Sequence, residues 1–285
     1  MTISVLMSVY KSEEPAFLDR SLSSISIEQT IKPDEIILIE DGKLTDELYH
    51  VIEKWKQQLG EKLLLLENEK NIGLTKSLNR GLEFIKSDLI ARMDSDDISC
   101  PDRFEKQAAY LSTHSDIDVL GGAIYEIDEN ENIINKRYYP TNQKAILKSI
   151  FRANPIAHSS AMIRASLFKK GLRYNEKYRT NQDLALWFDA ICEGHKLANL
   201  PDIILLFRRE SGVYQRRRRK HNLWVEFKIY CIGIKRIYGL FSLKYVYPIM
   251  RFCLKLMPTK IVRMAYMSNI RKIVTEHEVN YKRHQ

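Results

Sequence analysis

Short apolar runs alternate with segments of helical periodicity through the first hundred residues. The apolar runs are residues 3–9, 35–40, 63–67 and 89–94. Each run has the length and composition of a parallel strand that is buried on both faces. The segments between them carry large apolar residues every three or four positions, as at Leu74, Leu78 and Leu82, and are expected to be amphipathic helices. This alternation predicts right-handed strand–helix–strand crossovers and an open, doubly wound α/β sheet.

The pattern becomes mixed after residue 101. Pro101 suits the first turn of a helix, and the stretches DVLGGAIYEID and IINKRYY, separated by DENEN, predict a β-hairpin. SAMIR predicts another strand, and NQDLALWFDAICEG, residues 181–194, predicts a helix. A mostly parallel first half followed by a mixed second half indicates that the first half holds a nucleotide and the second half an acceptor.

Three aspartates, Asp94, Asp96 and Asp97, follow the fourth apolar run in the sequence LIARMDSDDIS. Carboxylates placed this close repel one another and are costly to bury, and a bound divalent cation is the simplest compensation. Ligands of such sheets bind at the carboxyl ends of the strands. The spacing therefore favours Asp96 as a ligand of Mg²⁺ or Mn²⁺ and Asp94 as a partner of ribose hydroxyls. A solvated acidic turn, with Asp97 near a helix N-terminus, is the alternative.

The net charge of +9 is concentrated towards the end of the 285-residue chain. Residues 207–285 contain 19 Lys and Arg against 4 Asp and Glu, a balance of +15, whereas residues 1–206 have a balance of −6. This asymmetry predicts a body of residues 1–210 and a basic helical region of residues 211–285.

Cysteine usage and the N-terminus both point to the cytoplasm. Four scattered cysteines without a C-x-x-C pair argue against a disulfide framework or a zinc site. The first residues, MTISVLMSVYK, lack the features of a signal peptide, and no uncharged apolar run reaches the length of a membrane span.

The basic region interleaves cations with large apolar and aromatic residues from Lys228 to Arg251. This pattern is typical of helices that lie in the plane of an anionic membrane, and it predicts peripheral association with the inner face of the plasma membrane. A helical subdomain packed on the body is one alternative. Nucleic-acid binding is another, but it leaves the acidic body unexplained, so no nucleic acid is expected as a partner. Arg216 and Arg217 could also contact donor or acceptor phosphates.

Six motifs occur in one order along residues 4–187: SVLMSVYK, IILIEDG, NIGLTKSLNRGL, ARMDSDDIS, NPIAHSSAMIR and NQDLALW. Together they resemble the inverting glycosyltransferases of family 2, which have the nucleotide-binding GT-A fold. The likeness is greatest to bacterial enzymes that build O-antigen or capsule repeat units.

The resemblance implies roles for individual acids. Asp41 would contact the uracil base, Asp94 the ribose, and Asp96 a Mn²⁺ or Mg²⁺ ion. Asp183 would be the general base. His158, in the NPIAHSSA segment, could hydrogen-bond an acceptor or a phosphate, although a histidine satisfied in the interior has the same pattern.

The resemblance also places other residues in the nucleotide-sugar pocket. These residues are Tyr10, Asn71, Gly73 and Asn79. The chain departs from the family pattern at three positions: Ser8 stands where proline is usual, Lys76 where arginine is frequent, and Gln182 where glutamate precedes the base. The third departure puts in doubt the group that supports Asp183.

The implied function is metal-dependent, inverting transfer of a sugar from a nucleotide donor, UDP-linked, to a saccharide on a polyprenyl diphosphate in bacterial surface-polysaccharide synthesis. Two alternatives remain open from the residues alone. A nucleotidyltransferase is expected to begin with a Gly-rich phosphate loop, and this chain begins SVLMSVYKSEEP. A non-enzymatic polyanion-binding protein would bind RNA and release no UDP.

Overall fold

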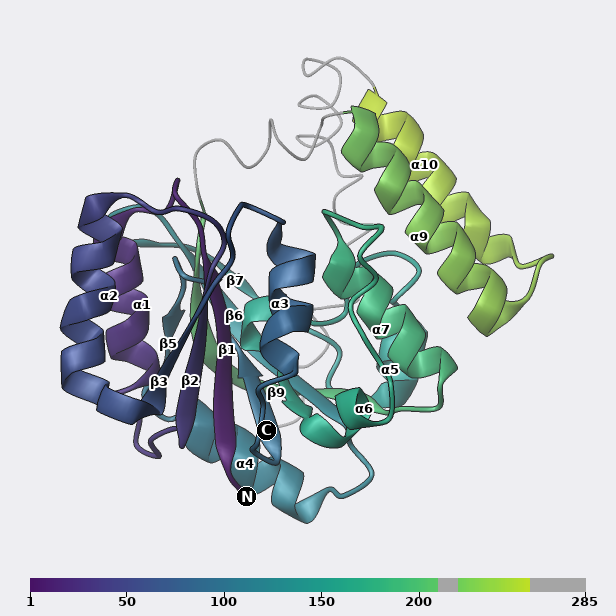
Figure 1. Cartoon of the computed structure of the whole chain (residues 1–285). Helices are drawn as coiled ribbons and strands as arrows, with labels where there is room; N and C mark the ends of the chain where they lie inside the picture. Colours follow the sequence, from purple (N-terminus) through teal and green to yellow (C-terminus); the bar gives the residue numbers. More distant parts are fainter. Residues whose placement is uncertain (210–219, 257–285) are drawn as a thin grey trace. The chain divides into compact units, whose positions relative to one another are not determined.

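The computed structural model describes residues 1–209 and 220–256 of the chain (Figure 1). The chain divides into two compact units, residues 1–210 and 211–285. The strands of the first unit are β1 (Ile3–Val9), β2 (Glu35–Glu40), β3 (Leu63–Glu67), β4 (Leu89–Arg92), β5 (Ile98–Ser99), β6 (Val119–Ile127), β7 (Ile133–Arg137), β8 (Met162–Arg164) and β9 (Leu197–Arg208). Its helices are α1 (Pro15–Ile25), α2 (Asp46–Leu59), α3 (Leu74–Leu82), α4 (Arg103–Thr113), α5 (Gln143–Leu147), α6 (Ala165–Lys169) and α7 (Gln182–Cys192), with 3₁₀ turns η1 (Gly60–Lys62) and η2 (His158–Ser160).

The strands of the first unit form one sheet in the order β3-β2-β1-β4-β8-β6-β9-β5, with β7 paired to β6. The strands β3, β2, β1 and β4 run parallel, whereas β8 is antiparallel to both β4 and β6. Strands β6 and β9 are parallel to each other. The structure therefore confirms an α/β fold whose mixed sheet begins with a parallel half.

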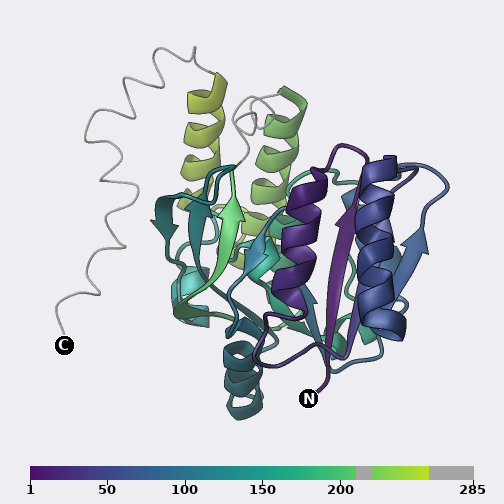
Figure 2. The ribbon, with the colours of Figure 1, turned by 90° about the vertical axis from the view of Figure 1, so that its left-hand side faces the viewer.

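Helices cover both faces of the parallel half. On one face α1 and α2 lie side by side (Figure 2), and Leu18 and Trp55 join Val5 of β1 in one buried core. On the other face α3 packs so closely that a Cβ on Gly81 would meet the side chains of Leu6 and Ile39. Successive side chains of β1 thus point to opposite faces of the sheet and pack in two separate cores, as expected for a strand buried on both faces.

Most of the predicted elements are present. The first three strands have the predicted bounds, and the hairpin, the SAMIR strand and the helix that opens at Gln182 are confirmed. The fourth strand ends at Arg92, two residues early, where the chain turns into the aspartate loop. The helix expected at Pro101 begins at Arg103, with Pro101 in the preceding turn.

The long strand β9 was not predicted. Pro201 and Asp202 interrupt its apolar pattern, and its pairing with β6 shifts register on both sides of Ala123. Because of this irregularity, the segment lacks the unbroken pattern of apolar residues by which a strand is predicted from sequence.

The second unit is a helical hairpin within its described residues. Helix α9 (Lys220–Tyr238) leads through the 3₁₀ turn η3 (Leu243–Tyr245) into α10 (Val246–Leu256), and Figure 1 shows α9 and α10 side by side. The rings of Trp224 and Phe252 pack with centroids 4.7 Å apart between the two helices. Neither these helices nor those described in the first unit are long and apolar enough to cross a bilayer.

Candidate active site

The order of the strands reverses between β1 and β4, which are parallel neighbours in the sheet. Ligands of open α/β sheets bind in the crevice at the carboxyl ends of the strands on either side of such a point. Tyr10, which is exposed, follows β1, and the aspartate loop follows β4. The fold therefore directs the predicted nucleotide site to this edge of the sheet.

The three aspartates of the loop converge. One carboxylate oxygen from each of Asp94, Asp96 and Asp97 lies within 4.8 Å of the others. Burial and the neighbouring carboxylates raise the pKa of Asp96 to about 9, and burial together with the charge of Asp94 raises the pKa of Asp97 to about 7. The cluster is thus a concentration of negative charge that needs a compensating cation.

The donor set of this cluster fits Mn²⁺ or Mg²⁺. Both ions prefer carboxylate oxygens and bind with one or two protein carboxylates, completed by phosphates and water. Asp97 is completely buried, and the hydroxyl of Ser159 beside it lowers its pKa, but no hydrogen bond of ordinary geometry reaches its Oδ2 atom from the described residues. A buried carboxylate oxygen without a donor is an acceptor that a cation, or water bound to one, would satisfy.

Arg208, at the end of β9, fixes the aspartate loop. Its backbone N–H donates to Asp97 Oδ1 (2.8 Å), and its Nε donates to the carbonyl oxygen of Asp96 (3.0 Å). Its guanidinium is buried and lies 4.0 Å from the ring centroid of Phe17 in α1. Arg208 was not predicted as a site residue. It lies at the border of the basic region, so in the sequence it cannot be distinguished from the other cations of that region.

Arg92 is a second arginine that the sequence analysis missed. It is the last residue of β4, is almost fully buried, and donates an Nη2 hydrogen bond to Asp94 Oδ1. Its Nε and Nη1 atoms have no hydrogen-bond partner in the part of the chain that the structure describes. A cation inside the apolar run LIARMD was the available signal, because an arginine is rarely buried without a partner.

Asp183 lies in the first turn of α7, as predicted. Asn154 donates its side-chain amide to Asp183 Oδ2. Burial raises the pKa of Asp183, while the Asn154 hydrogen bond and the positive charge of Arg92 lower it. Asn154, from the NPIAHSS segment, therefore supports the carboxylate at a site where Gln182 replaces the usual glutamate, and the sequence analysis did not identify it.

His158 lies beside the same arginine. Burial and the charge of Arg92 lower its pKa well below the ordinary value, so the ring is neutral. Its Nε2 atom and the hydroxyl of Tyr174 are hydrogen-bonded at 2.8 Å, and its ring meets Trp187 edge-on. Trp187 is fully buried, in keeping with a core residue of α7.

Asp41 organises the loop before α3. Its carboxylate accepts hydrogen bonds from the backbone N–H groups of Ile72 (2.8 Å) and Gly73 (2.9 Å) and from the side chain of Asn68 (3.0 Å). Asn71 donates in turn to the carbonyl oxygen of Asp41 (3.3 Å). In this structure Asp41 binds the protein's own backbone, and its contact with a base stays a prediction.

Asn79 joins α3 to the segment before α7. Its amide oxygen accepts from the backbone N–H of Tyr174 (3.0 Å), and its amide nitrogen donates to the carbonyl oxygen of Tyr174 (2.9 Å) and to Glu176. The side chain is thus used in holding Tyr174, and its predicted contact with the nucleotide is untested. Arg216 and Arg217 lie outside the described residues.

The predicted residues fall into two groups. In the first, Arg92 bonds to Asp94, which lies in one cluster with Asp96, and the charge of Arg92 lowers the pKa of both His158 and Asp183. The second group is the Asp41 loop with Asn71 and Gly73.

A family model described as Glycosyl transferase family 2 matches residues 4–172 of the chain. The chain belongs to glycosyltransferase family 2. This family 2 glycosyltransferase is therefore an enzyme, and the non-enzymatic polyanion-binding protein and the nucleotidyltransferase are both excluded.

Curated relatives resemble this glycosyltransferase over most of its length. An uncharacterized glycosyltransferase of Haemophilus influenzae is 35% identical over 95% of this chain and 100% of its own. The amylovoran biosynthesis glycosyltransferase AmsE of Erwinia amylovora is 33% identical over 92% of this chain and 97% of its own. An Escherichia coli UDP-Gal:alpha-D-GlcNAc-diphosphoundecaprenol beta-1,3-galactosyltransferase is 33% identical over 75% of this chain and 76% of its own.

Solved structures share the GT-A fold of this glycosyltransferase. Staphylococcus aureus TarS 1–349 in complex with UDP-GlcNAc superposes with a TM-score of 0.61 at 18% identity, over 98% of this chain and 87% of that one. The mannosyltransferase PcManGT of Pyrobaculum calidifontis, in complex with GDP-Man and Mn²⁺, superposes with a TM-score of 0.62 at 11% identity, over 99% and 88% of the two chains.

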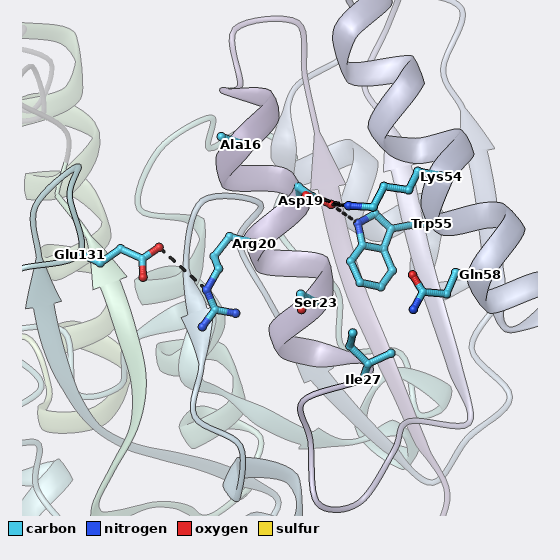
Figure 3. A pocket seen from close by; sticks show the side chains of 9 residues that line it. All are labelled: Ala16, Asp19, Arg20, Ser23, Ile27, Lys54, Trp55, Gln58 and Glu131. Carbon is cyan, nitrogen blue, oxygen red and sulfur yellow. Dashed lines mark hydrogen bonds and ion pairs between the residues drawn. The ribbon is translucent and has the colours of Figure 1, made fainter.

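A surface groove of about 480 Å³ between α1 and α2 of the glycosyltransferase is not part of this site (Figure 3). The polar groups that line it bind one another. Lys54 Nζ and Trp55 Nε1 both donate hydrogen bonds to Asp19 (2.7 and 2.6 Å). Arg20 pairs with Glu28 and faces Glu131. None of the residues that line the groove has a buried side-chain polar atom without a hydrogen-bond partner.

Proposed function

We propose that the enzyme transfers a hexose from a UDP-sugar to a saccharide carried on a polyprenyl diphosphate, with inversion at the transferred carbon, in the synthesis of a bacterial surface polysaccharide. The observation that carries the proposal is the grouping of the aspartate loop, Arg92 and Asp183 at the point where the sheet reverses its strand order. The aspartate loop would hold a cation against the departing diphosphate, and Asp183 would accept the proton of the attacking hydroxyl.

The donor half of the proposal rests on the aspartate loop. Asp96 is assigned to the metal that neutralises the diphosphate, and Asp94, oriented by Arg92, to the ribose. A divalent cation bound there would act as a Lewis acid that stabilises the charge on the departing UDP. TarS, solved with UDP-GlcNAc, and PcManGT, solved with GDP-Man and Mn²⁺, share the fold and bind nucleotide sugars, which supports a donor of this class.

The loop of residues 71–73 is assigned to the uridine. Asp41 holds two of its backbone N–H groups, and Gly42 lets the chain turn against Asn71 with a φ of 84°. Tyr10 stands exposed at the end of the adjacent strand β1. A rigid loop beside an exposed aromatic ring is a suitable surface for a planar base.

Asp183 is assigned as the general base. Inversion requires a single in-line displacement, so the base must act on the side of the sugar opposite the departing UDP. A carboxylate from the second half of the chain meets that requirement, and the bond from Asn154 holds it in one orientation. The positive charge of Arg92 favours the ionised form that can accept a proton.

The acceptor is inferred from relatives. The E. coli relative is named for transfer to GlcNAc on diphosphoundecaprenol, AmsE for amylovoran biosynthesis, and the E. coli protein WbnJ for O-antigen biosynthesis. A saccharide on such a carrier would be presented at the inner face of the plasma membrane, where we place the enzyme as a peripheral protein.

Turnover with defined substrates tests the proposal. UDP-Glc, UDP-Gal, UDP-GlcNAc and UDP-GalNAc are each incubated with Mn²⁺ and a synthetic GlcNAc-diphosphate-lipid, and the product is identified by mass spectrometry and by the anomeric coupling constant. We expect one donor to be used, with inverted configuration. A product of retained configuration, or no transfer from any of the four donors, would refute it.

A further inference from the structure

A row of large apolar side chains is exposed on α10 and on the turn that precedes it. Phe241 is 96% exposed and Leu243 is 88% exposed. The full row, called here the tip surface, comprises Leu240, Phe241, Leu243, Val246, Ile249, Met250 and Leu254. Monomeric proteins rarely expose this many large apolar residues together, and such patches mark sites of association.

The tip surface is one face of an amphipathic helix. Val246, Ile249 and Met250 follow the three- and four-residue spacing of a single helix face, which continues to Leu254. The opposite side of α10 packs on α9, where Pro248 is buried. A helix that hides its polar side and exposes its apolar side requires an apolar environment outside the unit.

The cations of α10 are turned away from the tip surface. Arg251 and Lys255 both pair with Glu226 of α9, at 2.9 Å for Arg251 Nη2. Their positive charges lower the pKa of Glu226. These three residues therefore fasten α10 to α9 and fix which side of α10 faces outward.

Positive charge is exposed on α9 of the same unit. Lys228 and Lys235 are exposed on the same helix face as Trp224 and Ile232, which are also exposed. Residues 220–256 contain seven Lys and Arg, and Glu226 is their one acidic residue. A second copy of the chain would bring like charges together at this surface, whereas anionic lipid headgroups would neutralise them.

We propose that the tip surface inserts into the headgroup region of an anionic lipid bilayer, with α10 in the plane of the membrane and the excess positive charge of residues 220–256 attracted to the lipid phosphates. An interfacial helix buries its apolar face about 5–10 Å into the boundary between headgroups and acyl chains. The proposal gives a physical route to the membrane location in the proposed function. It is tested without substrate, so either can fail alone.

The experiment measures cosedimentation of the full-length protein with vesicles of phosphatidylcholine alone and of phosphatidylcholine and phosphatidylglycerol in equal amounts. We expect the wild type to bind the mixed vesicles. The double variant Phe241→Ala/Leu243→Ala should bind them roughly tenfold more weakly or worse, because both side chains lose the apolar surface that they would bury in the bilayer. The variant Lys228→Glu/Lys235→Glu should lose the preference for phosphatidylglycerol.

A matched control comes from the first unit. Ile133 and Ile134 of β7 are also more than half exposed, so Ile133→Ala/Ile134→Ala likewise truncates two exposed apolar side chains, far along the chain from the tip surface. We expect this control to bind vesicles like the wild type. UDP binding, assigned to the first unit, should be equal in all variants and reports that this unit is folded. Equal far-UV circular dichroism reports that the helical hairpin of the second unit is intact.

Three outcomes would overturn the proposal. The tip variant could sediment with mixed vesicles as well as the wild type does. The control could lose as much binding as the tip variant, which would reveal unspecific adsorption. Light scattering could show that the wild type is a dimer and that the tip variant is a monomer, which would make the surface an interface between copies.

Discussion

The side-chain amide of Asn154 donates a hydrogen bond to the carboxylate of Asp183 across 29 positions of sequence. The bond joins the segment before η2 to the first turn of α7 and holds the Oδ2 atom of Asp183. A general base must be held in one orientation to meet its proton donor, and this contact supplies that restraint.

Asp183→Asn should abolish transfer while leaving the donor site intact. The amide cannot accept the proton of the acceptor hydroxyl, and loss of a general base typically costs about 10²–10⁴-fold in rate. UDP-sugar binding, measured by calorimetry, should match the wild type, and the melting temperature should shift by only a few degrees because asparagine keeps the size of aspartate. Asp189→Asn on the same helix is the control and should retain activity. A kcat near the wild-type value in Asp183→Asn would remove Asp183 from the role.

Asn154→Ala should move the acid limb of the pH–rate profile to higher pH. Burial already raises the pKa of Asp183, and the Asn154 hydrogen bond opposes that rise. Without the bond the carboxylate is protonated at a higher pH, so activity falls earlier as the pH is lowered. The profile of kcat, measured with saturating donor, reports the shift. A uniform loss of kcat at every pH, with the limb unmoved, would show that Asn154 supports only the local fold.

Asp96→Asn should abolish metal-dependent activity without destabilising the metal-free protein. Without metal the Asp96 carboxyl is already protonated at neutral pH, because its pKa is about 9. Asparagine then replaces a neutral group of the same size, so in EDTA the variant should melt close to the temperature of the wild type. Mn²⁺ at 100 times its Kd should stabilise the wild type by about 2.7 kcal/mol and leave the variant unchanged. Asp102→Asn, in the next turn and paired with Lys106, is the matched acid outside the cluster. Full transfer by the wild type in excess EDTA would contradict the metal assignment.

Arg92 and Asp94 should be strongly coupled in a double-mutant cycle of unfolding free energies. Removing one partner of a buried ion pair costs about 3–5 kcal/mol, and the loss in Arg92→Met should fall near the lower end because Asp94 is partly exposed. Arg92→Met/Asp94→Asn should lose less than the sum of the single variants, since neither charge is then left alone. Additive losses would mean that the two side chains act independently.

Gly42→Ala should weaken UDP binding as well as stability. Gly42 has a φ of 84°, and a Cβ there would lie 2.5 Å from the backbone nitrogen of Asn71. The left-handed conformation alone costs about 1–2 kcal/mol. Gly60→Ala is the control, because Gly60 also has a positive φ but nothing lies within 4 Å of its Cβ position. Both variants should lose stability, and only Gly42→Ala should raise the Kd for UDP. If the two variants had the same Kd for UDP, the loop of residues 71–73 would not contact the nucleotide.

The parts of the fold that follow from local pattern could be predicted from sequence. Strands β1, β2 and β3 are unbroken apolar runs between polar turns, so their bounds are those expected. Strand β9 could not be predicted in this way, because Pro201 and Asp202 interrupt it and its partner β6 supplies the missing regularity.

The site divides along the same line. Asp94, Asp96 and Asp183 stand out because of their neighbours in sequence. Arg92 and Asn154 matter because of neighbours in space, and neither the burial of an arginine nor a hydrogen bond 29 residues away leaves a local pattern.

Arg208 has a practical consequence for shortening the protein. The side chain and the backbone of this last residue of β9 bind Asp96 and Asp97, and the carbonyl oxygens of Asp128 and Glu129 accept from the same guanidinium. A chain cut after Phe207 would keep eleven of the twelve residues of β9 and yet release the loop assigned to the metal. The loop proposed to hold the metal therefore depends on the whole of Arg208, and fragments that end at Phe207 and at Arg208 should differ sharply in Mn²⁺ affinity.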